Sequence, residues 1–534
     1  MPAVVFDRWE TPLGDRDGFG YGNGFFGGEG WVRLRDESTI AVNVSPGNTP
    51  HTGDGLSSGS TREILKVIST NNFNWPYLWI THTGRVYVKQ TLNDATHYIG
   101  TVAPTTDAPG DYGVCVLPEG NGNTQILVGG MRSGGVWRVD LDVLSGSPTF
   151  TQETSHPTGG ANGIACYNGR VFSVDRYENY PDGGRTRVYY GAVNDYSSST
   201  WTADGSGNFD LPQSFQREPS WPNSGLPRQA GIVGTLTDGI YFKNDGAIYR
   251  LNRDPEIGSL SKVTEETFVG GFAAGDVLMG FTDRLAPAAF NGASVMPLSH
   301  LNLDDSRPPI YQQDVLRGAM STDYKSAILT RGNDALVLNG GMWSKCRLSL
   351  GDNDSPGTTA VCANKDGDGV IVCSKGSGGI FFRDYKFPDV NAGIVEADIL
   401  GRGGKAVPTG NELRLPLISD PNGMVVVREV HIDGYFADST LRTSSDLVCV
   451  VRIQPQFSTR ADPGAVTQEI READLGLSHS PSLATIHYPF RVTVRAHKLA
   501  YHSAAAKVSI TGATSMALGR ITVVYDVEPY LAAS

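Results

Sequence analysis

Residues 164–174 read IACYNGRVFSV, an apolar run in strand rhythm, an Asn-Gly pair and a second apolar run. The same phrase returns as WITHTGRVYV over 79–88, GIYFKNDGAIYRL over 239–251 and VCANKDGDGVIV over 361–372. Asn-Gly and Asp-Gly pairs tolerate the positive φ angles of a tight turn, so each phrase predicts a β-hairpin. Hairpins that return about every 40 residues are typical of β-propeller blades. Because that scaffold serves enzymes, lectins and assembly proteins alike, the repeat indicates architecture more firmly than function.

The composition agrees with an all-β protein. The chain of 534 residues holds 65 glycines and 30 prolines, and only 19% of its residues are charged. Glycine and proline break helices and punctuate strands, so this balance favours a turn-rich, strand-rich fold. A chain of this length exceeds what one hydrophobic core usually supports, and we therefore expect at least two domains.

The charge balance and the first residues limit the classes of function. Lys and Arg total 44 against 56 Asp and Glu, a formal net charge of −12, which argues against a surface that grips nucleic acid through its phosphates. Met1–Glu10 lacks the basic start and long apolar stretch of a signal peptide, and no apolar run approaches the ~18 residues of a membrane-spanning helix. We expect synthesis in the cytoplasm and no membrane-spanning segment.

The cysteines are scattered and form no CxxC pair. Most lie within strand-like runs, which favours buried free thiols that pack as small hydrophobes. A metal site or a disulfide would require that distant cysteines converge in space. The six are Cys115, Cys166, Cys346, Cys362, Cys373 and Cys449.

Three segments follow one another along the chain. Residues 1–61 include a glycine and aromatic alternation at 18–31 and a Gly/Ser/Thr/Pro-rich linker at 46–61, and we interpret them as an extended docking arm. A leader packed loosely on its own propeller is the alternative. Residues 62–388 carry the hairpin phrase and predict a propeller of six or seven irregular blades, a ring that the N-terminal segment could close by donating a strand. Residues 181–228 interrupt it with an insertion that we expect to form surface loops.

Residues 389–534 show a different pattern. Longer alternating strands are predicted over 425–436, 447–453, 491–497 and 521–527, with apolar residues on one face and Arg, Thr and His on the other. This alternation is typical of an antiparallel β-sandwich of two sheets. Residues 467–477 are the one place where we expect a short helix, because acidic and apolar residues interleave there.

We identify no catalytic, cofactor-binding or metal-binding residue, and no cofactor is expected. Residues 364–369 begin like a calcium loop, but Lys375 stands where a bidentate Glu is required, so a hairpin turn is favoured. Ser173–Tyr177 starts like the Asp-containing turn of sialidase propellers, yet Tyr177 occupies the glycine position. Nucleophile-elbow, zinc-protease and phosphate-loop motifs are missing from the sequence.

Ten histidines are dispersed along the chain, and five lie in the C-terminal segment. Four of these are close in sequence and could form a metal site or a pH-sensitive interface, because imidazole titrates near neutrality. At strand spacing, surface or interface positions are the simpler interpretation. The four are His479, His487, His497 and His502.

The order of arm, irregular blades and C-terminal sandwich resembles the tail nozzle or tail hub proteins of short-tailed bacteriophages, including the packaged-DNA stabilisation type. The leader residues 6–9 (FDRW) and 30–35 (GWVRLR) are also similar to the leaders of such proteins. The resemblance covers nearly the whole chain and rests on domain order and the hairpin phrases.

That resemblance implies a structural virion protein of the tail, made in the host cytoplasm, with no enzymatic role. It implies a homo-oligomeric ring, usually of about six copies, that docks to the portal, the adaptor and other tail proteins. The ring would close and conduct the genome's channel without binding DNA specifically. An acidic wall suits that passage, because a basic wall would bind phosphates and stall the duplex.

Two other functions stay open from the sequence. A phage or extracellular propeller that binds carbohydrate or a receptor could stack sugar rings on aromatic residues in or beside the insertion, and a propeller hydrolase or lyase would use paired carboxylates. The aromatic residues are Tyr177, Tyr180, Trp201 and Trp221.

Overall fold

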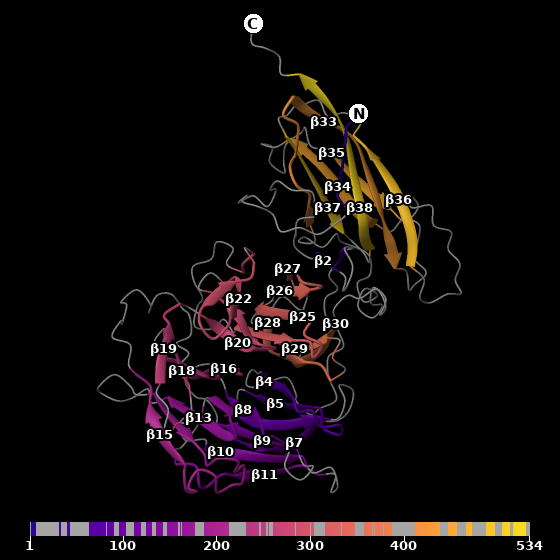
Figure 1. Ribbon diagram of the computed structural model, residues 1–534. Coiled ribbons are helices and arrows are strands. Elements are labelled where there is room, and N and C mark those ends of the chain that lie inside the picture. The colour runs from indigo at the N-terminus through magenta and orange to yellow at the C-terminus, as the bar shows by residue number, and fades with distance from the viewer. Residues whose placement is uncertain are drawn as a thin grey trace. The chain divides into compact units, whose positions relative to one another are not determined.

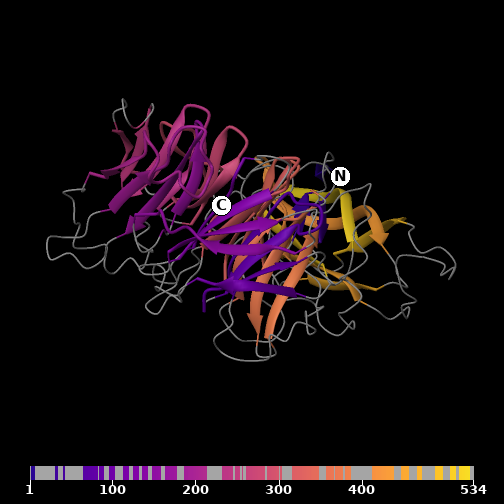
Figure 2. The same ribbon diagram turned by 90° about the horizontal axis from the view of Figure 1, so that it is seen from below.

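The structure is a computed structural model of the 534-residue chain, shown in two directions in Figure 1 and Figure 2. It describes residues 2–6, 31–33, 40–42, 64–81, 83–89, 96–102, 112–118, 124–130, 135–141, 147–157, 161, 163–176, 186–212, 231–244, 247–252, 255, 260–266, 268–282, 285–299, 301–303, 316–332, 334–347, 357–365, 367, 369–376, 379–386, 412–437, 447–455, 466–471, 487–496, 505–512 and 516–529. Within these ranges the chain is all-β, and no helix is long and apolar enough to cross a membrane.

Most of the strands form antiparallel sheets that are consistent with propeller blades, and we number these blade-like sheets 1 to 7. Sheet 1 holds β4 (Ile64–Ser69), β5 (Tyr77–Thr81), β6 (Arg85–Lys89) and β7 (Thr96–Thr101); sheet 2 holds β8 (Gly113–Val116), β9 (Thr124–Gly129), β10 (Val136–Leu141) and β11 (Thr149–Gln152); sheet 3 holds β12 (Gly163–Tyr167), β13 (Arg170–Arg176), β14 (Thr186–Tyr190) and β15 (Gly207–Asp210).

The remaining blade-like sheets follow in the same way. Sheet 4 holds β16 (Gly231–Leu236), β17 (Gly239–Asn244), β18 (Ala247–Leu251) and β19 (Leu260–Thr264); sheet 5 holds β20 (Val269–Ala274), β21 (Val277–Phe281), β22 (Pro287–Phe290) and β23 (Val295–Pro297); sheet 6 holds β24 (Leu316–Met320), β25 (Ser326–Arg331), β26 (Asp334–Asn339) and β27 (Met342–Arg347); sheet 7 holds β28 (Gly357–Ala363), β29 (Gly369–Gly376) and β30 (Gly379–Lys386).

The predicted hairpins form at the quoted phrases. Asn168 and Gly169 both have positive φ angles, 47° and 73°, and join β12 to β13 with Tyr167 paired to Arg170. Gly84 has a φ angle of 75° between β5 and β6, and Asn244 pairs with Ala247 across the turn of β17 and β18. The angles of Asn168 and Gly169 are the left-handed conformations that a two-residue turn requires, and Gly and Asn adopt them most readily.

Neighbouring blade-like sheets contact one another through their first strands. β8 lies against β12, and the contacts continue through β16, β20, β24 and β28 to β4. Sheets 1 and 2 share a buried cluster that includes Leu65, Val86 and Ile126. Each sheet therefore covers the apolar face that its neighbour cannot bury alone.

Sheet 7 packs against sheet 1 through side chains of both sheets. Trp79 and Tyr87 of sheet 1 share a buried cluster with Ile371 and Cys373 of sheet 7. The backbone N–H of Lys365 also donates to the Tyr77 hydroxyl at 2.9 Å.

One cation joins three first strands at this place. Arg317 on β24 donates from Nε to the Thr359 carbonyl of β28 and from Nη2 to the Leu65 carbonyl of β4, each at 3.2 Å. A planar guanidinium can satisfy two carbonyls at once in fixed directions, so it sets the spacing of sheets 6, 7 and 1.

The prediction that the insertion at residues 181–228 forms surface loops was wrong in part. Residues 181–228 contain β14 and β15, the two outer strands of sheet 3. β14 pairs with β13, and β15 pairs with β14. This pairing is favoured because Val188 and Tyr190 of β14 bury their side chains in the cluster between sheets 3 and 4. The two strands are short, and the residues 191–206 that connect them are rich in Gly, Ser and Asn, so the sequence pattern indicated a loop.

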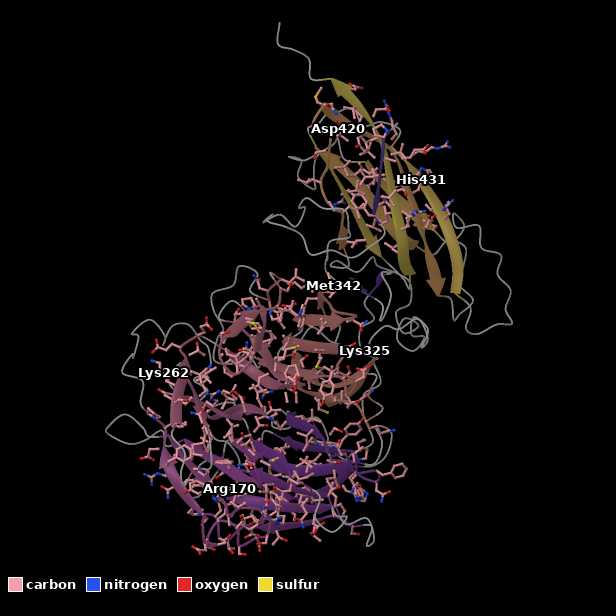
Figure 3. The ribbon with its side chains drawn as sticks, viewed as in Figure 1. Arg170, Lys262, Lys325, Met342, Asp420 and His431 are labelled. Atoms are coloured by element: carbon pink, nitrogen blue, oxygen red, sulfur yellow. The ribbon has the colours of Figure 1, made fainter. Side chains whose placement is uncertain are left out.

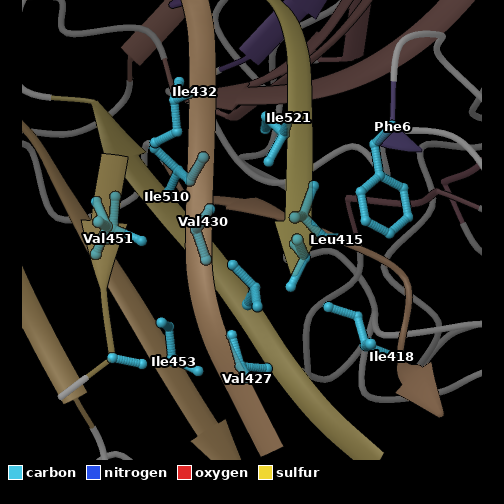
Figure 4. Close-up of a cluster of buried hydrophobic side chains, with 14 of the residues drawn as sticks. Phe6, Leu415, Ile418, Val427, Val430, Ile432, Val451, Ile453, Ile510 and Ile521 are labelled. Carbon is cyan, nitrogen blue, oxygen red and sulfur yellow. The ribbon is translucent and has the colours of Figure 1, made fainter. Parts of the chain in front are cut away.

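Two further sheets share one apolar core. The first holds β1 (Ala3–Phe6), β2 (Trp31–Arg33), β3 (Ile40–Val42), β33 (Gly423–Ala437), β36 (His487–Arg495) and β38 (Met516–Pro529); the second holds β31 (Glu412–Arg414), β32 (Ile418–Ser419), β34 (Leu447–Pro455), β35 (Val466–Arg471) and β37 (Ala505–Gly512). Their inward residues, among them Val430, Val451 and Ile510, form the cluster in Figure 4. The long strands predicted after residue 389 are present.

The short helix predicted over 467–477 was wrong. Residues 466–471 form β35, where Ile470 pairs with Cys449 of β34 and is buried in the shared core. Pairing along a whole neighbouring strand outweighs the weak helical preference of a few residues. Residues 472–486 lie outside the described ranges.

The N-terminal strands pair with the end of the chain. β1 runs antiparallel to β38, with Ala3 opposite Val524 and Phe6 opposite Ile521, and β3 pairs with β38 through Ile40 and Leu518. Among the described strands, none of β1 to β3 joins a blade-like sheet. Residues 18–30 of the predicted docking arm, and the linker at 46–61, lie outside the described ranges.

The chain divides into two compact units. One comprises Met1–Asn48, Asp334–Ser349 and Lys386–Ser534, and the other comprises Thr49–Asn333 and Leu350–Tyr385. The N-terminal strands thus belong to the same unit as the two C-terminal sheets.

We predict that replacing Phe6 by Ala lowers the free energy of unfolding of that unit by about 3–5 kcal/mol, because the ring is buried and leaves a cavity. Val5→Ala is the control, since the neighbouring side chain points outward and is 38% exposed, and it should change stability by only about 0.5 kcal/mol. Urea unfolding measures both. Equal effects would contradict a structural role for β1.

Candidate functional site

Buried polar groups concentrate between blade-like sheets 2 and 3, within one compact unit. The apolar frame of this interface includes Leu127 and Val136 from sheet 2 and Val171, Tyr189 and Trp201 from sheet 3. Polar side chains from both sheets lie beside it. We treat this interblade region as the candidate functional site.

A charged network occupies the sheet 2 side of the interface. Arg138 on β10 donates from Nε to Glu153 Oε1 at 2.6 Å and from Nη1 to Gln125 Oε1 at 2.7 Å, and Gln125 Nε2 donates to Asp140 Oδ2 at 3.2 Å. Arg138 and Asp140 lie on one face of β10 because alternate strand residues point the same way. The ion-paired side chains of Arg138 and Glu153 are only 11% and 1% exposed.

Three atoms of this network keep unused hydrogen-bonding capacity. Arg138 Nη2, Asp140 Oδ1 and Glu153 Oε2 are buried without a protein partner among the described residues. Thr200 Oγ1 and Trp201 Nε1, in the segment that follows β14, share that condition. Buried polar groups of this kind are commonly satisfied by ordered water.

A histidine and a serine meet beside the network. His156 Nε2 lies 2.8 Å from Ser173 Oγ, and the Trp201 ring meets the imidazole edge-on with centroids 4.6 Å apart. A serine bonded to a histidine is the arrangement of a nucleophile and its base. However, Ser173 has no exposed surface, so the contact as it stands supports packing between the sheets and offers no path to a substrate.

A lysine is buried between sheets 4 and 5. Lys243 on β17 donates from Nζ to the Phe268 carbonyl at 2.6 Å. Burial disfavours the charged form and lowers the pKa of Lys243 to about 8. The group therefore ties two sheets together while carrying a charge that costs stability.

Paired charges cover the outward face of the C-terminal sheet. Arg428 bonds Asp526, Arg491 bonds Asp433, and Arg495 lies 3.4 Å from Glu429. The Arg491 guanidinium donates to Asp433 and lowers the pKa of that carboxyl. These pairs are solvent-exposed, so each contributes little to stability and mainly shapes the surface.

His431 belongs to the same face, where Figure 3 labels it. Its Nδ1 lies 2.9 Å from Thr493 Oγ1 and its Nε2 3.2 Å from Glu429 Oε2. The predicted cluster of four histidines is not tested by this contact. The side chains of its members, His479, His487, His497 and His502, lie outside the described part of the chain.

Of the four aromatic residues predicted to stack on sugars, the structure describes one. Trp201 is 5% exposed and packs on His156, so the prediction that it could stack on a sugar ring was wrong. Its Ser-rich surroundings suggested a surface loop, and nothing local indicated the interface it fills. Tyr177, Tyr180 and Trp221 lie outside the described residues.

The calcium-like segment is the hairpin turn between β28 and β29. Val361 pairs with Val372 across it, and Asn364 Oδ1 accepts the Gly367 N–H at 2.7 Å, so this asparagine oxygen closes the turn. Ser173–Arg176, which begins like a sialidase turn, lies within β13.

The cysteines include a contact that the sequence did not reveal. Cys115 and Cys166 are free thiols whose sulfur atoms lie 3.4 Å apart, although 51 positions separate them in the chain. Cys362 and Cys373 are free and buried, as predicted for small hydrophobes. The side chains of Cys346 and Cys449 lie outside the described part.

Comparisons with known proteins concern the fold. No protein-family model and no curated protein matches the chain. Solved structures that are similar include a chain of a mitotic checkpoint complex (11% identity, 65% of this chain and 93% of that one, TM-score 0.40), the β-propeller domain of Cps50 (Swd1) from Myceliophteria thermophila (10%, 62% and 98%, 0.38) and YCF48 bound to D1 peptide (13%, 71% and 100%, 0.38). These identities and TM-scores are too low to indicate a function for the chain.

We predict that Glu153→Ala lowers the free energy of unfolding by about 3–5 kcal/mol, because Arg138 is left buried without its counter-charge. The double variant Arg138→Met/Glu153→Leu should lose much less, since it removes both charges. Arg187→Ala, which breaks an exposed pair with Asp210, should cost about 1 kcal/mol or less. Urea unfolding monitored by tryptophan fluorescence compares them. A Glu153→Ala loss as small as that of Arg187→Ala would contradict the buried-pair account.

We predict a pH-dependent difference between the wild type and Lys243→Met. The folded pKa of Lys243 is about 8 against 10.5 in a free lysine, so between these values the unfolded chain binds more protons. Stability from this group therefore rises with pH, and the wild type should gain about 2–3 kcal/mol on the variant between pH 7 and 10. Lys325→Met, at an exposed position, is the control. Parallel stability curves for the wild type and Lys243→Met would contradict the prediction.

Proposed function

We propose that this protein is a structural component of a short-tailed bacteriophage tail, of the nozzle or hub type, with no enzymatic role. In this proposal the blade-like sheets form a propeller of seven blades and the two C-terminal sheets form a β-sandwich. The protein acts in the virion after synthesis in the host cytoplasm.

The observation that carries the proposal is the pairing of β1 and β3 with β38. It gathers the N-terminal strands into the same compact unit as the two C-terminal sheets, while most of the blade-like sheets form the other unit. A chain of two packed β bodies can act as a wall or spacer, because such cores resist deformation.

The placement of reactive groups also supports a scaffold. His156, Ser173 and Glu153 are buried between sheets and hold side chains in place. The exposed ion pairs lie instead on the face of the sheet that carries Arg428, Asp433 and Arg491. Rows of exposed charge set orientation and register when two protein surfaces meet. We propose that this face contacts a neighbouring copy or another tail protein, such as the portal or adaptor.

The net charge of −12 supports the proposed relation to DNA. An acidic channel wall repels phosphates weakly, so the genome passes without specific binding. We therefore propose that carboxylates outnumber Lys and Arg on the surface that faces the channel of the assembled ring.

Light scattering and negative-stain imaging of the full chain test this proposal, together with filter binding of duplex DNA at low salt and a glycan array. We expect ring-shaped particles of about six copies, no retention of DNA and no glycan binding. Monomers that bind a defined glycan would contradict the proposal and favour a receptor-binding propeller.

A further inference from the structure

Two thiols meet where the first strands of sheets 2 and 3 run side by side. Cys115 lies on β8 and Cys166 on β12, and their sulfur atoms are 3.4 Å apart. The strands are close because Gly113, on the same face as Cys115, lacks a side chain: a Cβ there would lie 2.9 Å from the Ala161 carbonyl oxygen and from Ile164 Cγ1. The contact is therefore built into the packing of these two sheets.

The two sulfur atoms are a small movement from a covalent bond. A disulfide needs an S–S distance of about 2.05 Å, so the two sulfur atoms must approach from their present 3.4 Å for the bond to form. Both cysteines retain some exposed surface, whereas Cys362 and Cys373 are buried.

The pair also favours formation of one thiolate. When Cys115 loses its proton, the Cys166 S–H donates to it, and this hydrogen bond lowers the pKa of Cys115. The same contact, together with burial, raises the pKa of Cys166. Cys115 is thus the nucleophile and Cys166 the resolving thiol, a division found in reactive dithiols.

The chain contains its own comparison pair. Cys362 on β28 and Cys373 on β29 are fully packed in the cluster between sheets 7 and 1, and burial raises the pKa of Cys373 well above its usual range. Cys362 and Cys373 share one cluster, whereas sulfur contact, thiolate formation and exposure select Cys115 and Cys166.

We propose that Cys115 and Cys166 form a reversible disulfide site that reacts with low-molecular-weight disulfides and covalently joins blade-like sheets 2 and 3. The Cys115 thiolate attacks one sulfur of oxidised glutathione and expels the first glutathione thiolate. The Cys166 thiol gives up its proton and its sulfur then attacks Cys115 Sγ, which expels the second glutathione. Two protein thiols are oxidised to one disulfide, the glutathione disulfide is reduced to two thiols, and the two protons end on the departing thiolates.

The bond closes a loop that spans 51 positions of the chain and includes β9 to β11. Such a cross-link restricts the unfolded chain and is expected to stabilise the folded state. The inference rests on the geometry of sheets 2 and 3 and does not depend on the proposed tail function.

The test incubates the full-length folded protein in a series of reduced-to-oxidised glutathione ratios. Free thiols are then blocked with iodoacetamide, and the protein is digested and mapped by mass spectrometry. We expect a cross-linked peptide pair that contains Cys115 and Cys166, lacks two hydrogens and disappears after treatment with dithiothreitol. Cys362 and Cys373 should be recovered as blocked thiols when the blocking step is performed in urea. The oxidised protein should unfold at a higher urea concentration than the reduced protein.

Two variants separate the steps. Cys166→Ser should stop at a mixed disulfide between glutathione and Cys115, and Cys115→Ser should form much less adduct at Cys166. The wild-type peptide map decides the proposal even if a variant fails to fold. Recovery of Cys115 and Cys166 as free thiols at the most oxidising ratio, or equal cross-linking of Cys362 and Cys373, would overturn it.

Discussion

The guanidinium of Arg317 is the contact on which the arrangement of the blade-like sheets most depends. It lies on the first strand of sheet 6 and reaches backbone carbonyls on the first strands of sheets 7 and 1, so that one side chain spans the two interfaces where the array returns to its beginning. Each sheet has apolar residues on both faces and is stable only when both faces are covered. A failure at this place would expose Trp79 and Tyr87 on one side and Ile371 on the other, because these residues form the cluster beneath the contact.

The chemistry of the described residues serves this same packing. Arg138 and Glu153 between sheets 2 and 3, and Lys243 between sheets 4 and 5, place charges beside clusters of buried apolar side chains. A buried charge that is well paired adds little stability but penalises any arrangement in which its partner is missing. These groups therefore favour one specific stacking of the sheets. A wall that must hold its form in an assembly benefits from that specificity, which agrees with the proposed scaffold role.

Local patterns predicted the hairpins, because Asn168 and Gly169 specify their turn through their own backbone preferences. The long strands after residue 389 were also predictable, since alternation of buried and exposed residues is a property of the strand itself. Contacts between distant positions were not. Nothing near Ala3 indicates a partner at Val524, nothing near Cys115 points to Cys166, and β35 is a strand only because β34 is beside it. The candidate site was missed for this reason, as its parts come from sheets that meet only after folding.

Hydrogen–deuterium exchange of Arg317→Met against the wild type tests the central claim most directly, since methionine keeps an apolar side chain but donates no hydrogen bond. If the guanidinium fixes the return of the array, amide exchange should become faster in β4, β24 and β28, while β33 and β38 of the other unit keep wild-type rates. Unchanged exchange in β4 and β28, with the wild-type midpoint of urea unfolding, would contradict the account.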